Sequence, residues 1–176
     1  MKINKTKLHI TIYVVAIIFL GFSFSRIFFK PAEKNSSSSA PLFASVINDP
    51  DGKPQNLKQF QHKTIVLNFW ATWCPPCIEE LPLIDAFYAA NQAKSFQVVG
   101  LAVDQPSMVR RYLTQKPLRF PNGLAGFNGT ALGQTLGNAQ SVLPYSVLFA
   151  ANGRLLKQKA GKLEKSDLDA WLQLVS

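Results

Sequence analysis

Cysteine and histidine are scarce in this sequence, which contains two of each among 176 residues. So few cysteines exclude a disulfide-rich scaffold. A structural zinc site needs four ligands, and the two histidines do not complete one, because His9 borders an apolar N-terminal segment and His62 lies in a polar loop. The pair formed by Cys74 and Cys77 therefore requires its own explanation, and we expect no metal site.

The sequence also lacks any concentrated block of charge, although its formal net charge is +9. The 19 lysine and arginine residues are scattered along the chain. Because binding tails are marked by charge blocks and not by totals, we interpret the charge as a solvated surface and expect no nucleic-acid partner. A glycine-rich phosphate loop, a Ser-His-Asp constellation and an internal repeat are also missing, and no organic cofactor is expected.

An uncharged apolar segment occupies residues 8–25, if His9 is counted as neutral. About 18 to 20 apolar residues can span a bilayer, whereas a secretory signal peptide has a shorter apolar region and a small-residue cleavage site. The cleavage candidates ending at Ala40 and Ala44 are weak. We therefore predict an uncleaved signal anchor with one transmembrane helix in residues 1–30, and cleavage is the alternative.

A polar linker is expected at residues 31–41, which include four consecutive serines, and a folded domain at residues 42–176. Within the domain, apolar and β-branched runs predict strands, and apolar residues at helical spacing predict helices. Strands are expected at residues 43–47, 64–70, 96–103, 145–150 and 154–159, and helices at residues 74–92, 106–115, 130–136 and 166–174, the last with Ser166 as N-cap. This alternation predicts an α/β fold with a mixed sheet.

Cys74 and Cys77 lie between a predicted strand and a predicted helix, where a C-x-x-C motif indicates redox chemistry. A cysteine at a helix N-terminus is close to the positive end of the helix dipole and to free N–H groups. Both favour the thiolate, which is the reactive form. We expect Cys74 to be the exposed nucleophile and Cys77 the buried resolving thiol, which together exchange disulfides through a mixed disulfide with a partner protein.

Two prolines separate the cysteines and indicate the direction of the reaction. Neither Pro75 nor Pro76 has an N–H, so the N–H of Cys77 is the one backbone donor left in this turn for the first sulfur. Two acids, Glu79 and Glu80, add negative charge to the same turns. Because a less stabilised thiolate makes a more reducing couple, the hypothesis is a reductase-type site.

Residues 69–77 read FWATWCPPC, which resembles the thioredoxin superfamily and, more narrowly, its TlpA/ResA/DsbE-like membrane-tethered branch. Further matching positions are Asp51-Gly52, Leu57, Pro82, Leu143-Pro144-Tyr145, Gly153 and Gly161, so the resemblance covers residues 41–174. It implies a thioredoxin-like fold, with a central mixed β-sheet flanked by helices. It also implies a cis Pro144 that faces the disulfide and lies in a loop that pairs with an extended substrate peptide. The expected substrate-binding residues are Trp73, Pro75, Pro76, Leu143 and Pro144.

The sequence departs from thioredoxin six residues before the first cysteine, where Asn68 replaces a buried aspartate. In the TlpA/ResA-like branch an acid is often found near the disulfide at the position of Glu80, so the resemblance makes Glu80 a candidate proton handler and third catalytic residue. The alternative is a solvated glutamate that interacts favourably with the helix dipole. Glu79 is expected at the surface, and residues 122–137 are expected to form an inserted region of the family.

The expected function is that of an enzyme, a thiol–disulfide oxidoreductase that reduces disulfides in extracytoplasmic proteins. The resemblance implies a place in the inner (cytoplasmic) membrane with the catalytic domain in the periplasm, and recycling by a membrane electron donor of the DsbD/CcdA type. Expected clients are apocytochrome c, proteins of metal-site assembly and oxidised secreted proteins, and the domain is expected to be monomeric. Two alternatives stay open. One is a metallochaperone that holds Cu(I) between Cys74 and Cys77, and the other is a non-catalytic adaptor, against which the retention of both cysteines argues.

Overall fold

A seven-stranded mixed sheet forms the centre of the domain. Its strand β3 (Thr64–Trp70) is buried at every position after the first, as its apolar run predicts. The strand order is β2-β1-β5-β4-β3-β6-β7, in which β4 runs parallel to β3 and β5 and the other neighbours are antiparallel. The other strands are β1 (Val46–Asn48), β2 (Pro54–Asn56), β4 (Phe96–Ala102), β5 (Asn122–Leu124), β6 (Tyr145–Phe149) and β7 (Leu155–Ala160). The expected α/β class with a mixed sheet is confirmed.

The computed structural model describes residues 39–44, 46–94 and 96–175. The chain divides into two units, Met1–Asn35 and Ser36–Ser176, and every described residue belongs to the second. The signal anchor expected in residues 1–30 and residues 31–38 of the expected linker lie outside the described residues. In the ranges that are described, we find no helix with the length and apolar character needed to cross a membrane.

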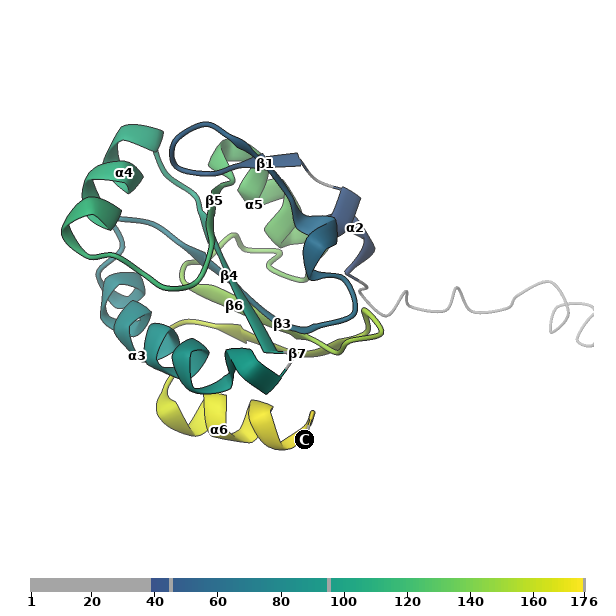
Figure 1. Cartoon of the computed structure of the whole chain (residues 1–176). Helices are drawn as coiled ribbons and strands as arrows, with labels where there is room; N and C mark the ends of the chain where they lie inside the picture. The colour runs from purple at the N-terminus through teal and green to yellow at the C-terminus, as the bar shows by residue number, and fades with distance from the viewer. Residues whose placement is uncertain (1–38, 45, 95, 176) are drawn as a thin grey trace, which may run out of the picture. The chain divides into compact units, whose positions relative to one another are not determined.

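Helices cover both faces of the sheet (Figure 1). They are α2 (Ala40–Ala44), α3 (Pro75–Asn91), α4 (Pro106–Gln115), α5 (Gly126–Thr135) and α6 (Lys165–Gln173), with 3₁₀ turns η1 (Leu57–Phe60) and η2 (Gln92–Lys94). Alternate residues of β3 point to opposite faces. Val66 and Trp70 pack in a first apolar cluster with residues of α3, α4 and α6, whereas Leu67 and Phe69 pack in a second cluster with residues of α2, η1 and α5.

The prediction of a strand at residues 43–47 is wrong for its first two residues. Phe43 and Ala44 belong to α2, and the strand begins at Val46. The N–H of Phe43 donates to the carbonyl of Ser39 at 3.1 Å, which closes a helical turn. This turn places Leu42 in the second cluster, where it is 1% exposed. Helix α2 also contains the last two residues of the expected linker.

Residues 122–137 contain more regular structure than expected, because the short strand β5 precedes the helix. This strand continues the sheet between β4 and β1, and the helix begins at Gly126, four residues before the expected start at residue 130. The three residues of β5 include a central glycine and are too few to show the alternation of apolar residues that predicts a strand. The pairing is visible only in three dimensions, since Gly123 lies against the side chain of Ile47 from β1.

The last helix begins one residue earlier than expected, and its N-cap is Glu164, not Ser166. Glu164 and Asp167 form a capping box, in which the N–H of Glu164 donates to Asp167 Oδ2 at 2.8 Å. Serine is a stronger intrinsic N-cap than glutamate. The reciprocal pair of hydrogen bonds reverses that preference here.

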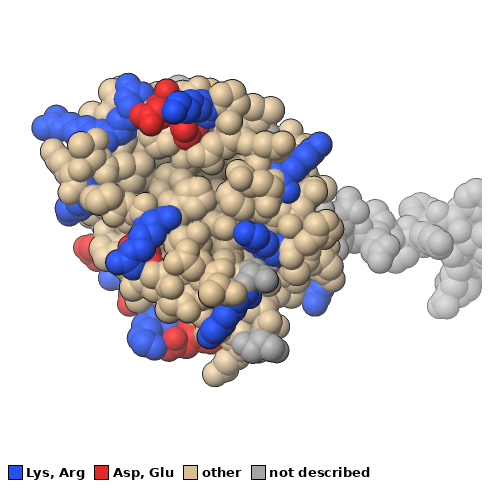
Figure 2. Space-filling view, viewed as in Figure 1, with Lys and Arg blue, Asp and Glu red and all other residues tan. Residues whose placement is uncertain are grey.

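Basic side chains are spread over the face of the domain seen in Figure 2, with acidic groups close to several of them. Arg119 pairs with Asp85 at 3.7 Å and Lys165 with Asp169 at 2.5 Å. The distribution agrees with the interpretation of the net positive charge as a solvated surface.

Candidate active site

The two cysteines form a disulfide at the point where β3 leads into α3. Cys74 is the N-cap of α3, and the Cα atoms of Cys74 and Cys77 lie 5.3 Å apart. Pro75 and Pro76 occupy the first two helical positions, as the spacing predicts. They leave the N–H of Cys77 as the first backbone donor of the helix, which agrees with the expected shortage of donors near the first sulfur.

The expectation that Cys74 is exposed is wrong for this oxidised form. Cys74 is 4% exposed and Cys77 is fully buried. Both belong to the first apolar cluster, and Leu143, from the loop before β6, packs against that cluster. The disulfide joins the Cys74 sulfur to a fully buried residue. The small remaining exposure nevertheless belongs to the first cysteine, which fits the order of attack expected for the pair.

The turn before Cys74 is fixed by an acid that the sequence reasoning missed. Asp104 follows β4, and its Oδ2 accepts hydrogen bonds from the N–H and the hydroxyl of Thr72 at 2.8 and 2.5 Å. The N–H of Val103 also donates to the carbonyl of Trp70 at 2.8 Å. The carboxyl ends of the parallel strands β3 and β4 meet at one edge of the sheet, and this rule could have identified Asp104.

The residues expected to bind substrate lie at the same end of the sheet as the disulfide. The Leu143–Pro144 peptide bond is cis, as the resemblance implied. Pro144 precedes Tyr145, which pairs with Phe69 near the end of β3. Trp73 is 65% exposed and Val142 is 38% exposed. Apolar side chains are therefore exposed in the segments that precede Cys74 and the cis peptide bond, although sequence reasoning did not include Val142.

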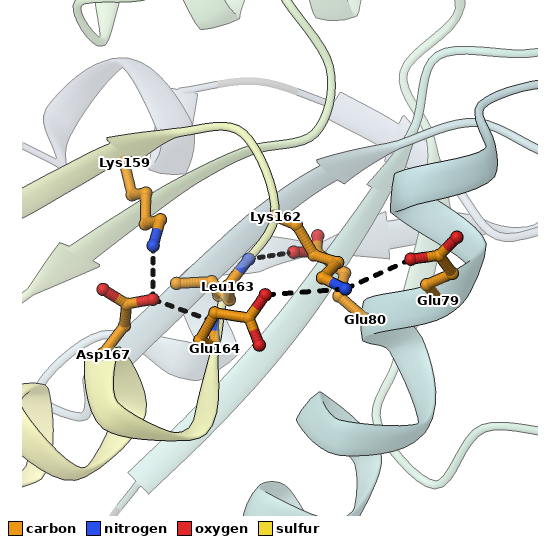
Figure 3. Close-up of polar contacts among 7 residues, drawn as sticks. All are labelled: Glu79, Glu80, Lys159, Lys162, Leu163, Glu164 and Asp167. Carbon is orange, nitrogen blue, oxygen red and sulfur yellow. Dashed lines mark hydrogen bonds and ion pairs between the residues drawn. The ribbon is translucent and has the colours of Figure 1, made fainter.

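Glu80 is buried, so the alternative of a solvated helix glutamate is wrong for this residue. It lies one helical turn after Cys77 on the same face of α3 and is 1% exposed. Its Oε1 accepts a hydrogen bond from Asn68 Nδ2 at 2.7 Å, and its Oε2 accepts one from the N–H of Leu163 at 2.5 Å. Hydrogen bonds thus join the carboxyl group to β3 and to the loop before α6, and Figure 3 shows the contact with Leu163.

Burial raises the pKa of Glu80 from its ordinary 4.5 to about 7. The hydrogen bonds from Leu163 and Asn68 and the charges of Lys159 and Lys162 oppose this rise. Near neutral pH the carboxyl group is therefore divided between its acid and its ionised form. Glu80 consequently adds less negative charge to the helix start than the sequence argument assumed, and it has the proton affinity that suits a general acid or base.

Ion pairs lie near the buried carboxyl group (Figure 3), and two of their lysines act on its pKa. Lys162 lies between Glu79 and Glu164, at 3.1 and 3.5 Å, and Lys159 pairs with Asp167. The side chain of Glu79 is 62% exposed, in agreement with the surface position expected for it. Within the ranges the structure describes, no three His, Cys, Asp or Glu side chains are placed to hold a metal ion together.

Comparison with known proteins identifies relatives along the whole chain. The model of the Redoxin family matches residues 35–172. The thiol-disulfide oxidoreductase ResA of Bacillus cereus is 30% identical over 178 residues, which cover 100% of this chain and 99% of ResA. The ResA protein of Geobacillus thermodenitrificans is 28% identical, with 99% and 98% covered.

Solved structures share the fold. A thiol:disulfide interchange protein of the thioredoxin family from Chlorobium tepidum superposes with a TM-score of 0.67 at 26% identity, and the match covers 74% of this chain and 92% of that one. A thioredoxin-related protein from Neisseria meningitidis serogroup B gives a TM-score of 0.65 at 30% identity, with 74% and 97% covered.

A thioredoxin-like sheet with a Cys-Pro-Pro-Cys disulfide at a helix start defines a thiol–disulfide oxidoreductase. The chain belongs to the Redoxin family, as a homologue of the ResA thiol-disulfide oxidoreductases. Its thioredoxin-like fold is the one implied by the resemblance.

Proposed function

We propose that this oxidoreductase works as a reductase, transferring two electrons from Cys74 and Cys77 to disulfides of extracytoplasmic proteins. The observation that carries the proposal is the start of α3, where prolines occupy both of the first helical positions. They remove two N–H groups that would otherwise stabilise the Cys74 thiolate. A less stabilised thiolate makes the dithiol the stronger electron donor.

The proposed reaction begins with attack of the Cys74 thiolate on a sulfur of the client disulfide. A mixed disulfide forms, and the other client sulfur leaves as a thiolate that takes a proton from solvent. Cys77 then loses its proton and attacks the Cys74 sulfur, which releases the second client thiolate and closes the Cys74–Cys77 disulfide. The client gains two electrons, and the enzyme is oxidised by two.

Glu80 is proposed to accept the proton of Cys77 in the second attack and to return it when the disulfide is reduced again. Its position one turn from Cys77 and its pKa near 7 support this role. A carboxyl group with the ordinary pKa of 4.5 would take up a thiol proton far less readily at neutral pH.

The client is proposed to bind across Trp73, Pro75, Pro76, Leu143 and Pro144. The exposed indole of Trp73 and the cis Pro144 loop at the same edge of the sheet support an extended peptide that lies over the disulfide. We propose apocytochrome c, proteins of metal-site assembly and oxidised secreted proteins as clients. Recycling needs a dithiol reductant, and we propose a membrane donor of the DsbD/CcdA type.

The cellular place proposed for the enzyme is the inner membrane, with a monomeric catalytic domain in the periplasm. The uncharged apolar run at residues 8–25 supports this anchoring. Cell fractionation tests it: the full chain should sediment with membranes. A form in which two lysines interrupt this run, Val15→Lys with Ile18→Lys, should not.

The reduction potential of the Cys74–Cys77 pair tests the direction of the reaction. The full chain in detergent is equilibrated in thiol redox buffers, and the fraction of reduced protein is measured by alkylation. A value near or below about −230 mV is expected for a reductase, whereas a value near −120 mV, roughly that of a strong oxidant, would contradict the proposal. The Cys77→Ser variant, which cannot form the disulfide, is the control.

A further inference from the structure

Asn68 connects the strand before the disulfide to the carboxyl group of Glu80. Its side chain in β3 is fully buried. Nδ2 donates to Glu80 Oε1 at 2.7 Å and to Ser146 Oγ at 2.9 Å. Ser146 is equally buried and lies directly opposite Asn68 in the antiparallel pair of β3 and β6. Three polar side chains from β3, α3 and β6 therefore meet on the sheet face that α3 covers.

The contacts of the Asn68 amide favour one orientation. Its Oδ1 is buried and has no hydrogen-bond partner among the described residues. If the side-chain amide were rotated by a half turn, its nitrogen and oxygen would exchange positions. The two N–H groups would then lie unpaired where Oδ1 lies now, and the oxygen would face the Glu80 carboxylate. Unpaired buried donors are costly, and an ionised carboxylate accepts hydrogen bonds only. The observed orientation, with Nδ2 toward Glu80 and Ser146, is therefore the one that suits an ionised carboxylate.

The groups that contact the Glu80 carboxyl are both donors, Asn68 Nδ2 and the N–H of Leu163. The charged groups around this contact are Lys159, Lys162, Glu79, Glu164 and Asp167, which form ion pairs with one another. Cys74 and Cys77 carry no charge in the disulfide. Hydrogen bonds to the charged form favour ionisation, whereas burial opposes it. Asn68 thus contributes a side-chain hydrogen bond that favours ionisation of this buried carboxyl group, in addition to the charges of Lys159 and Lys162.

We infer that Asn68 and Ser146 are positioning residues for the reduction, in which Ser146 orients the Asn68 amide so that it donates to the Glu80 carboxylate that takes the proton of Cys77. The inference rests on the proposed function. An aspartate at position 68 would place a second carboxyl group at hydrogen-bond distance from Glu80, and the two would share one proton. With asparagine at position 68, the proton can bind to only one carboxyl group, that of Glu80, which lies on the same helix as Cys77.

The test is a titration of Glu80 in the oxidised full chain in detergent. The chain contains four glutamates, Glu33, Glu79, Glu80 and Glu164, so glutamate labelled with ¹³C at the side-chain carboxyl gives few resonances. The Glu80→Gln variant identifies the Glu80 signal by its loss. Asn68→Leu should raise the pKa of Glu80 by about one, a tenfold change in proton affinity. A merely structural role for Asn68 would lower the melting temperature and leave this pKa unchanged.

Ser146→Thr and Ser146→Val form a matched pair, because their side chains have similar shapes and only threonine keeps the hydroxyl. Valine should raise the pKa of Glu80, and threonine should restore the value of the parent protein. This pair of variants tests the inference even if Asn68→Leu does not fold. Equal Glu80 pKa values in the two Ser146 variants would overturn the inference.

Activity separates this inference from the proposed function. If Glu80→Gln reduces a protein disulfide as fast as the parent while Asn68→Leu and Ser146→Val shift the Glu80 pKa, the positioning contact stands and the proton role of Glu80 fails. If Glu80→Gln is slow while the Asn68 and Ser146 variants fold and leave the Glu80 pKa unchanged, the proposed function stands and the inference is overturned.

Discussion

Asp104 holds Thr72 by two hydrogen bonds to one carboxylate oxygen, from the backbone N–H and from the hydroxyl. Thr72 lies two residues before Cys74, so this contact joins the end of β4 to the turn that presents the disulfide. A residue far from the cysteines in sequence thereby fixes the start of α3.

Asp104→Ala should destabilise the oxidised protein by about 2–3 kcal/mol, because it removes the two hydrogen bonds from Thr72 and one from the N–H of Gln105, and leaves the Thr72 N–H unpaired. Thr72→Val removes only the hydroxyl bond and should cost about 1 kcal/mol. Urea unfolding measures both. Equal losses in the two variants would show that the hydrogen bonds from the backbone N–H groups of Thr72 and Gln105 contribute nothing.

Glu80 should make the folded protein less stable as pH rises. Its folded pKa, about 7, lies above its ordinary 4.5, so the native state binds the extra proton between these values. The stabilisation is fully present below pH 4.5 and is lost as pH rises through about 7, a change on the order of 3 kcal/mol. The measurement is denaturant unfolding of the parent and of Glu80→Gln at several pH values. A difference in stability between them that does not vary with pH would contradict the assignment.

Lys162 should lower the proton affinity of Glu80 through its positive charge. Lys162→Gln removes that charge and is expected to raise the pKa of Glu80. Lys162→Arg keeps the charge and should leave the pKa of Glu80 at about 7. Because Lys162 lies at the surface, added salt should diminish the difference between the two variants. Carboxyl-labelled glutamate reports the pKa, and a Glu80 pKa that is the same in both variants at low salt would refute the expectation.

Trp73→Ala should weaken client binding without destabilising the fold. Trp73 is 65% exposed, and substitutions of exposed residues usually change stability by less than about 0.5 kcal/mol. The KM for a protein disulfide should rise, while reduction of the enzyme by dithiothreitol should keep its rate. The comparison variant is Trp70→Phe. Trp70 is fully buried and its Nε1 donates to Asn122 Oδ1 at 3.1 Å, so this change should cost stability instead.

The sequence predicted the parts of the molecule that depend on neighbouring residues. The structure confirms the buried strand at residues 64–70, the helix after Cys74 and the helix at residues 106–115. Each could be predicted because it follows a strong local pattern. The pairing of the cysteines could likewise be expected from their spacing.

The parts that the sequence could not predict depend on contacts between distant residues. Glu80 accepts a hydrogen bond from the N–H of Leu163, which is 83 residues away. The contact between Asn68 and Ser146 depends on the pairing of β3 with β6. The same holds for Asp104, whose partner Thr72 lies in the turn after β3, and for β5, which pairs with β1. The exposure of Cys74 was misjudged because the residue belongs to an apolar cluster that is assembled from elements distant in sequence.

The donor at Leu163 is a main-chain group, so nineteen of the genetically encoded residues at this position would present the same N–H to Glu80. Only proline would remove it. Mutational drift at position 163 can therefore alter the packing around the carboxyl group while its hydrogen bond persists. Changes in this packing would tune the acid through its burial, whereas substitutions of Asn68 or of the nearby lysines would alter a hydrogen bond or a charge that acts on it.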